Sequence, residues 1–188
     1  MRSVTYSMTV SLDGYVVGPD GRFDWLPPEE EVFRFATEEV RALGFHLLGR
    51  RLYEDMLFWE TADHDLPVDA TLMREFAALW QALPKVVFSR TLTEVKGNAR
   101  LATGSLAEEI ERLRAEPGEG NIAIGGATLA HEAAELGLLD EYRARVLAVL
   151  VGGGVPYFPQ GKRRVDLELL ETRALTPTVG FYHYRVAR

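Results

Sequence analysis

The sequence contains no cysteine, and this absence excludes disulfides, thiolate metal sites and a cysteine nucleophile. It also lacks any apolar run long enough to span a bilayer. Residues 1–15 show no continuous apolar core of the kind found in signal peptides. We therefore expect a cytoplasmic protein that does not cross a membrane.

Positive charge is scarce, because 21 lysines and arginines face 28 aspartates and glutamates and the formal net charge is -7. A protein that binds duplex nucleic acid needs a basic surface to displace counterions, so this class of function is excluded. The 188 residues are 47% hydrophobic, which is enough for a substantial core. We expect one domain over residues 1–188.

Residues 121–129, NIAIGGATL, predict a buried strand, a glycine turn and the start of a helix. A helix N-terminus presents free N–H groups and the positive end of the helix dipole, so it can hold a phosphate. Gly125 and Gly126 would let the backbone approach such a ligand closely. The alternative is a plain turn.

Three further predicted strands end in loops of unusual composition. Residues 4–10 lead into Ser11, Leu12, Asp13 and Gly14, residues 45–48 into Gly49, Arg50, Arg51 and Leu52, and residues 85–88 into Ser89, Arg90 and Thr91. Arginines beside a helix N-terminus are well suited to a phosphate. In the alternative interpretation, Arg50 and Arg51 pair with Glu54 or Asp55 on a solvated surface.

The remaining pattern completes an α/β fold. Helices are expected from Pro27 and Pro28 to Leu43, from Asp69 to Leu83, from Ser105 to about Ala115 and from Ala127 to Leu136; strands are expected at 99–102, 139–151, 165–175 and 180–186. This alternation predicts a mostly parallel sheet with helices on both faces and antiparallel strands at the end. The four unusual loops then share the carboxyl edge of the sheet, where ligands bind in such folds.

Two other loops invite a functional interpretation. Residues 13–28 carry Tyr15, Phe23 and Trp25, and we interpret them as a flap over a pocket; the alternative is that these aromatic rings cover the edge of the core. Asp63, His64 and Asp65 are interpreted as a polar loop, because no further ligand is spaced to complete a metal site. We expect no metal.

The composition of the four loops favours one cofactor. The glycine pattern lacks a third glycine and a following acid, which the usual dinucleotide fingerprint requires. An acid would accept a ribose 2′-hydroxyl, whereas Arg50, Ser89 and Arg90 would hold a 2′-phosphate. The residues therefore favour NADPH over NADH.

The segments SLDGY, LLGRRLYE, KVVFSRTL, IAIGGATL and VGGGVPYFP, in this order and spacing, resemble the dihydrofolate reductase-like superfamily. The resemblance is to stand-alone proteins similar to the reductase domain of bifunctional riboflavin-biosynthesis enzymes, the RibD C-terminal domain. It implies a three-layer fold with a central sheet of about eight strands. It also implies NADPH-dependent hydride transfer to a small heterocyclic, pteridine-like or ribosylaminouracil-like substrate.

The resemblance also implies roles for individual residues. Arg50, Arg51 and Leu52 would lie at the cofactor phosphates, Ser89, Arg90 and Thr91 at the adenosine 2′-phosphate, and Gly125, Gly126, Ala127, Thr128 and Leu129 at the pyrophosphate. It further implies a cis peptide between Gly125 and Gly126. Leu52 replaces the threonine common in the family, and the first lysine of the chain is Lys85, whereas riboflavin reductases carry one in the first strand.

The resemblance also implies a proton donor near the start of the first helix, after a tryptophan and a proline. Counting from Trp25 selects Glu30, whereas counting back from Gly49 falls on Phe33; Asp13 and Asp24 are the other candidate acids. Glu30 could instead serve only the helix dipole, and Asp13 could brace its turn. Alternative functions are a dihydrofolate or pterin reductase proper, or a nucleotide-binding protein without turnover. The resemblance is also consistent with a homodimer formed through the late strands.

Overall fold

The computed structural model describes residues 1–25, 29–62, 66, 70–161 and 164–188. Its strands are β1 (Val4–Ser11), β2 (Tyr15–Val17), β3 (Leu43–Gly49), β4 (Lys85–Phe88), β5 (Ala99–Leu101), β6 (Asn121–Gly125), β7 (Glu141–Leu147), β8 (Val155–Pro156), β9 (Leu167–Thr176) and β10 (Val179–Val186). Its helices are α1 (Glu30–Arg41), α2 (Arg50–Met56), the short 3-10 helix η1 (Leu57–Glu60), α3 (Thr71–Ala82), α4 (Leu106–Ala115) and α5 (Ala127–Glu135). The expected helix starts at Pro27–Pro28 and Asp69, and residues 63–65, lie outside the described residues.

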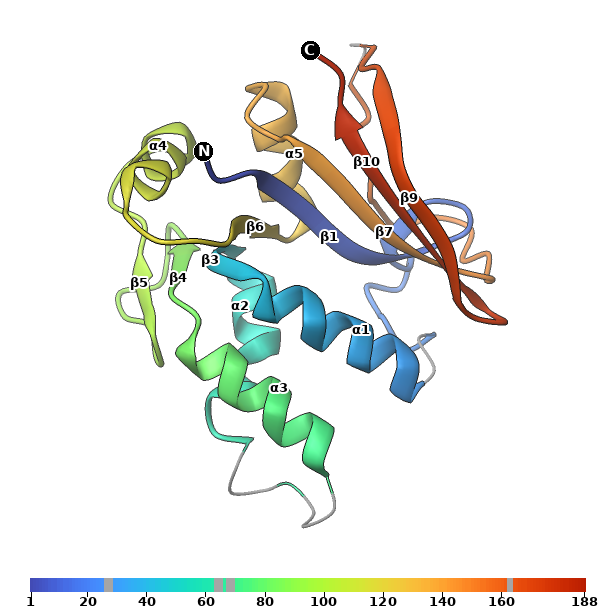
Figure 1. Ribbon diagram of the computed structural model, residues 1–188, viewed down its shortest axis with the longest axis horizontal. Coiled ribbons are helices and arrows are strands. Elements are labelled where there is room, and N and C mark those ends of the chain that lie inside the picture. Colours follow the sequence, from blue (N-terminus) through green and yellow to red (C-terminus); the bar gives the residue numbers. More distant parts are fainter. Residues whose placement is uncertain (26–28, 63–65, 67–69, 162–163) are drawn as a thin grey trace.

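Eight strands form one sheet in the order β5-β4-β3-β6-β1-β7-β10-β9. The strands from β5 to β7 are parallel, whereas β10 pairs antiparallel with both β7 and β9. Helices α1, α2 and α3 lie on one face and α4 and α5 on the other (Figure 1). The predicted mostly parallel sheet with antiparallel C-terminal strands is therefore confirmed.

The alternating pattern of β1 explains how the two layers form. Val4, Tyr6 and Val10 are buried in the main core under α4 and α5, because side chains alternate between the faces of a strand. Ser7 and Thr9 point to the opposite face, where Ser7 contacts Glu39 of α1. One face of β1 is therefore apolar, and the other is polar beneath a helix.

Local sequence patterns predicted some helix ends correctly and others incorrectly. Ser105 and Glu108 form the expected capping box at the start of α4. However, α1 ends at Arg41 and β3 already begins at Leu43, so Gly44 does not end the helix. A Cβ on Gly44 would lie 2.7 Å from the carbonyl oxygen of Glu119; this glycine permits a close chain approach instead.

Two expectations about the extent of strands and loops were wrong. The strand predicted for residues 139–151 is only β7, because the N–H of Ala148 bonds Thr178 and that of Val149 bonds Leu147 beyond the strand end. Residues 13–28 are not all loop, since β2 pairs antiparallel with β8. Three residues of the expected flap, Tyr15–Val17, thus form a small two-stranded sheet with Val155–Pro156.

Candidate functional site

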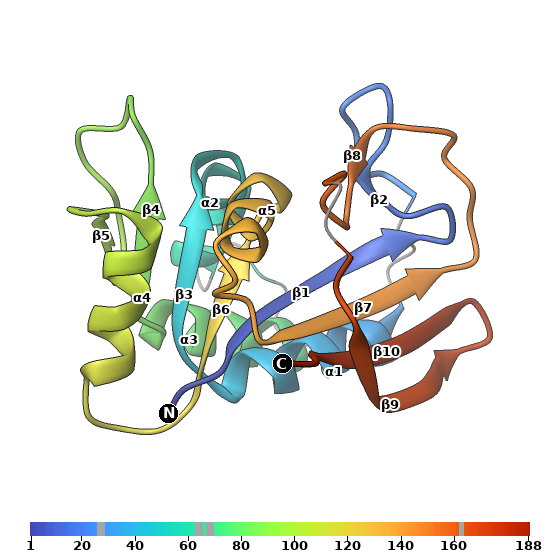
Figure 2. The same ribbon diagram turned by 90° about the horizontal axis from the view of Figure 1, so that it is seen from above.

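The four unusual loops follow four adjacent strands, β4, β3, β6 and β1, at the carboxyl edge of the sheet. The edge is stepped: pairing between β1 and β6 ends at Tyr6 and Ile124, whereas β1 stays paired with β7 as far as Ser11. Figure 2 shows β1 and β7 continuing past the end of β6. The ends of β3 and β6 therefore form the lower part of the step and β1 its wall.

Glycine is required twice in succession at the end of β6. A Cβ on Gly125 would lie 2.6 Å from Leu52 Cδ2, closer than a packed core allows. Gly126 caps α5 with φ of +98°, a conformation that side chains disfavour. The Gly125–Gly126 peptide is trans, as no peptide bond among the described residues is cis. The expected cis bond was wrong; positive φ at Gly126 makes the turn instead.

Helix α5 offers backbone groups rather than side chains to a ligand. Ala127 and Leu129 are buried in the main core, and Thr128 is exposed. The N–H groups of the first turn have no acceptor within the helix. If these residues hold an anion, they do so through their N–H groups and the helix dipole.

The loops after β3 and β4 contact each other through side chains. Arg50 Nη1 donates to Thr91 Oγ1 at 2.9 Å, and Arg50 Nε donates to Glu54 Oε1 at 2.9 Å. Ser89 Oγ accepts the N–H groups of Thr91 and Leu92 at 3.2 and 3.0 Å. The structure therefore brings Arg50, Ser89 and Thr91 together, and Arg50 also makes the surface ion pair with Glu54 that the sequence left open.

The other basic residues of these loops face solvent. Arg51 and Arg90 are exposed, and neither has a hydrogen bond or ion pair within the part of the chain that the structure describes. Leu52 points instead into the apolar cluster beneath β3 and β4. Two guanidinium groups are thus available at this edge, whereas the Leu52 side chain only packs.

Asp13 connects the loop after β1 with the glycine-rich segment that begins at Gly152. Its carboxylate accepts the N–H groups of Gly152, at 2.7 Å, and Val151. Hydrogen bonding from Ser11, together with these N–H groups, lowers the pKa of Asp13. The carboxylate therefore stays ionised and holds the glycine-rich loop, residues 152–154, against the end of β1.

The other candidate acids lie in exposed positions. Glu30 is ion-paired with Arg34 of the same helix, and 75% of its side chain is exposed. Asp24 pairs with Arg22 at 2.7 Å. Phe33, the residue selected by the count from Gly49, packs in an aromatic cluster under the sheet. No hydrogen bond or ion pair among the described residues joins Glu30 or Asp24 to the four loops.

The structure also contains a buried ion pair that the sequence pattern did not predict. Lys85, the first residue of β4, has no exposed side-chain surface and pairs with Glu60 at 3.1 Å. Its Nζ also donates to the carbonyl oxygens of Trp80 and Leu83. Burial, and secondarily the Lys85 charge, lowers the pKa of neighbouring His46 to about 3. This histidine is therefore neutral at ordinary pH.

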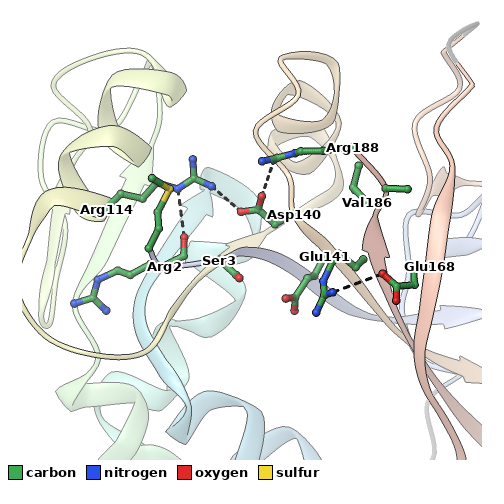
Figure 3. Close-up of a pocket in the computed structure, with 11 residues that line it drawn as sticks. Arg2, Ser3, Arg114, Asp140, Glu141, Glu168, Val186 and Arg188 are labelled. Atoms are coloured by element: carbon green, nitrogen blue, oxygen red, sulfur yellow. Dashed lines mark hydrogen bonds and ion pairs between the residues drawn. The ribbon is translucent and has the colours of Figure 1, made fainter.

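A hollow of about 500 Å³ lies at the opposite, amino edge of the sheet. There Asp140 accepts hydrogen bonds from Arg114 and Arg188, each at 2.6 Å (Figure 3). It also accepts one from the N–H of Val4. Since these arginines already have partners, the hollow is explained by the anchoring of β1, α4 and the last residues to one carboxylate.

No group of three or more histidines, aspartates or glutamates among the described residues could hold a metal ion. No helix within the described ranges is long and apolar enough to cross a membrane.

Comparison with known proteins gives consistent matches. Residues 2–181 match the protein family described as the RibD C-terminal domain. The chain is 28% identical over 178 residues to the uncharacterized protein YyaP of Bacillus subtilis (strain 168), which covers 95% of this chain and 92% of YyaP.

Solved structures share the fold. The diaminohydroxyphosphoribosylaminopyrimidine deaminase/5-amino-6-(5-phosphoribosylamino)uracil reductase of Thermotoga maritima superposes with a TM-score of 0.68 at 15% identity, covering 99% of this chain and 57% of that one. Dihydrofolate reductase from Enterococcus faecalis, in complex with NADP(H), superposes with a TM-score of 0.65 at 15% identity, covering 99% and 97%. The expected dihydrofolate reductase-like fold is confirmed.

Proposed function

Because the chain belongs to the RibD C-terminal domain family, we propose that it is a reductase that uses NADPH to reduce a small heterocyclic substrate. Two structural neighbours are reductases, and one of them was solved with NADP(H). When bound, NADPH would supply the hydride. The observation that carries the proposal is the convergence of Arg50, Ser89 and Thr91 with the glycine end of β6 on one sheet edge.

The residues present fit this cofactor. Gly49 and Gly126 bring two strand ends together, since a Cβ on Gly126 would lie 4.0 Å from the N atom of Gly49. The first turn of α5 would hold the pyrophosphate through N–H groups. Arg50, with the Thr91 hydroxyl, would hold a 2′-phosphate, which accepts charge-assisted hydrogen bonds.

The test is a parallel titration of the purified protein with NADPH and NADH, followed by tryptophan fluorescence. We expect NADPH to bind at least about tenfold more tightly, because a charge-assisted hydrogen bond contributes about 1.5–3 kcal/mol. Arg50→Gln should remove most of this preference. Arg185→Gln is the matched control, since Arg185 lies 3.6 Å from Glu168 at the opposite, amino edge of the sheet. Absence of binding to either nucleotide would refute the proposal.

The proton donor stays a prediction. Glu30 is the first candidate, and Asp13 and Asp24 are the next. Glu30 is exposed, so a substrate covered by the flap would have to bring it into a drier environment before its carboxyl could donate. Once a substrate is found, single-turnover hydride transfer by Glu30→Gln decides the role. An unchanged rate would leave Glu30 as a residue of the helix start only.

Two alternatives have specific support. A dihydrofolate or pterin reductase proper is favoured by the likeness to the Enterococcus faecalis enzyme, and NADPH oxidation with dihydrofolate would identify it. A nucleotide-binding protein without turnover is favoured by the engagement of the Asp13 carboxylate and the exposure of Glu30. Such a protein would bind NADPH but oxidise it with no heterocycle.

We also propose that the protein forms a homodimer through its last two strands. Leu167, Leu169 and Tyr182 are 38–52% exposed, and the pairing of β9 with β10 places them on one face of the sheet. A second copy packed on this face would bury them. Light scattering coupled to gel filtration should give twice the mass of 21.1 kDa; a monomer at micromolar concentration would contradict the proposal.

A further inference from the structure

The wall of the stepped edge carries a polar cluster on the α1 face. Ser7 is the residue of β1 that follows Tyr6, just as Gly125 follows its partner Ile124 in β6. Ser7 therefore stands level with the glycine that we assign to the cofactor. Because partners in parallel strands point to the same face, the Ser7 hydroxyl lies on the same side as the absent side chain of Gly125.

Arg145 of β7 reaches across β1 to this position. Its Nε donates to Thr9 Oγ1 at 3.2 Å and its Nη1 to Ser7 Oγ at 3.0 Å. Nη1 also pairs with Glu39 of α1, and only 12% of the Arg145 side chain is exposed. Within the described residues, the N–H groups of Nη2 have no hydrogen-bond partner, although a guanidinium offers five donors.

The Glu39 carboxylate serves two guanidinium groups, because Arg143 also pairs with it at 3.0 Å. Two further carboxylates on this face are engaged elsewhere: Glu141 pairs with His183 at 2.8 Å and Glu171 with Arg173 at 3.4 Å. Arg145 therefore shares its carboxylate partner with Arg143.

A guanidinium group with free donors beside a ligand site is suited to an oxygen acceptor. We propose that Arg145 determines substrate specificity by binding an anionic or carbonyl oxygen on the edge of a planar heterocycle. Ser7, Thr9 and Glu39 are positioning residues, because they fix the guanidinium through its other donors. This inference rests on the proposed reductase function and names the substrate class for that site.

The experiment uses two planar probes of the same shape, pyrazine-2-carboxylate and pyrazine-2-carboxamide. Each is titrated by calorimetry into the protein, with and without saturating NADPH. The carboxylate should bind at least about tenfold more tightly than the amide, as expected for a charge-assisted pair. Arg145→Gln should reduce the ratio of affinities to about one. The matched control Arg185→Gln should keep it, because Arg185 lies 3.6 Å from Glu168 at the far end of β10.

Two results would overturn the inference: equal binding of both probes to the wild type, or a preference that survives in Arg145→Gln. If Arg145→Gln does not fold, as judged by circular dichroism, Arg145→Lys decides. Lysine keeps the charge but loses the planar fork, so carboxylate affinity should fall while the preference persists; unchanged affinity would overturn the inference. Failure of NADPH binding would refute the reductase proposal alone, because the titration without NADPH still tests Arg145.

Discussion

Alanine substitutions at the two glycines of the β6–α5 turn would show whether this edge is built as described. At Gly125 the obstacle is packing: a Cβ would lie 2.6 Å from Leu52 Cδ2 and 2.8 Å from both His46 Nε2 and Leu48 Cδ2. These three side chains belong to packed elements on one face of the sheet. An added methyl group cannot move all of them aside without cost.

At Gly126 the obstacle is conformational. A Cβ there would have space, since the nearest atom in its surroundings is the N atom of Gly49 at 4.0 Å, but φ is +98°. An alanine must either take on this strained backbone or change the turn that begins α5. The two variants therefore test different physical causes one residue apart.

The magnitudes follow from these causes. Overpacking a core by a methyl group costs about 1–3 kcal/mol, and three simultaneous contacts place Gly125→Ala at about 2–3 kcal/mol by the same principle. Backbone strain at a positive φ costs about 1–3 kcal/mol, so Gly126→Ala should lose about 1–2 kcal/mol. Both losses are large relative to a typical free energy of unfolding of about 5–15 kcal/mol.

Urea unfolding followed by circular dichroism measures both losses. Gly161→Ala is the matched control, because no atom lies within 4 Å of its Cβ position and its φ is not positive; it should change stability by less than about 0.5 kcal/mol. A Gly125→Ala protein as stable as the wild type would refute the packing argument. In NADPH titrations Gly126→Ala should bind more weakly than Gly161→Ala, since it alters the turn that presents the α5 N–H groups.

Two further predictions concern buried charges. Burial alone would raise the pKa of Glu109, but hydrogen bonds from Arg100 and the Thr103 N–H outweigh it and lower this pKa to about 2. Because the folded pKa lies below the ordinary 4.5, this stabilisation is complete above pH 4.5 and is lost as the pH falls toward 2; urea midpoints of Glu109→Gln should fall less over that range than those of the wild type. Lys85→Met should lose about 3–5 kcal/mol because it leaves Glu60 buried and unpaired, and adding Glu60→Gln should recover part of this in a double-mutant cycle; simple additivity would contradict the pairing.

Sequence patterns predicted the elements whose causes are local. The capping box of α4 needs only Ser105 and Glu108, and β4 is a short, mostly buried run that directly follows Pro84. The strand–glycine–helix order likewise placed four loops at one edge, because parallel strands connected by helices must end on the same side. These inferences needed no knowledge of distant residues.

Elements that depend on distant partners were missed. Strands β2 and β8 contain three and two residues, too few to show any period, and each is stable only against the other. The apolar residues 148–151 resemble strand, yet the chain leaves the sheet there because Thr178 takes the N–H of Ala148. The expected cis peptide came from resemblance alone, and local backbone geometry at Gly126 provides the turn without it.

The same distinction applies to the site. The cofactor side could be predicted because glycines and arginines next to strand ends are visible in short segments. The Arg145 cluster could not, since Ser7, Glu39 and Arg145 come from three elements and lie 32 to 138 positions apart. A search for one acid near the start of the first helix selects residues by counting, whereas the structure places Glu39, an acid of this helix that contacts β1, near the other end of the helix. If Arg145 recognises the substrate, its charge selects which heterocycle binds, and the proton must come from another group, for which Glu30, Asp13 and Asp24 are the candidates.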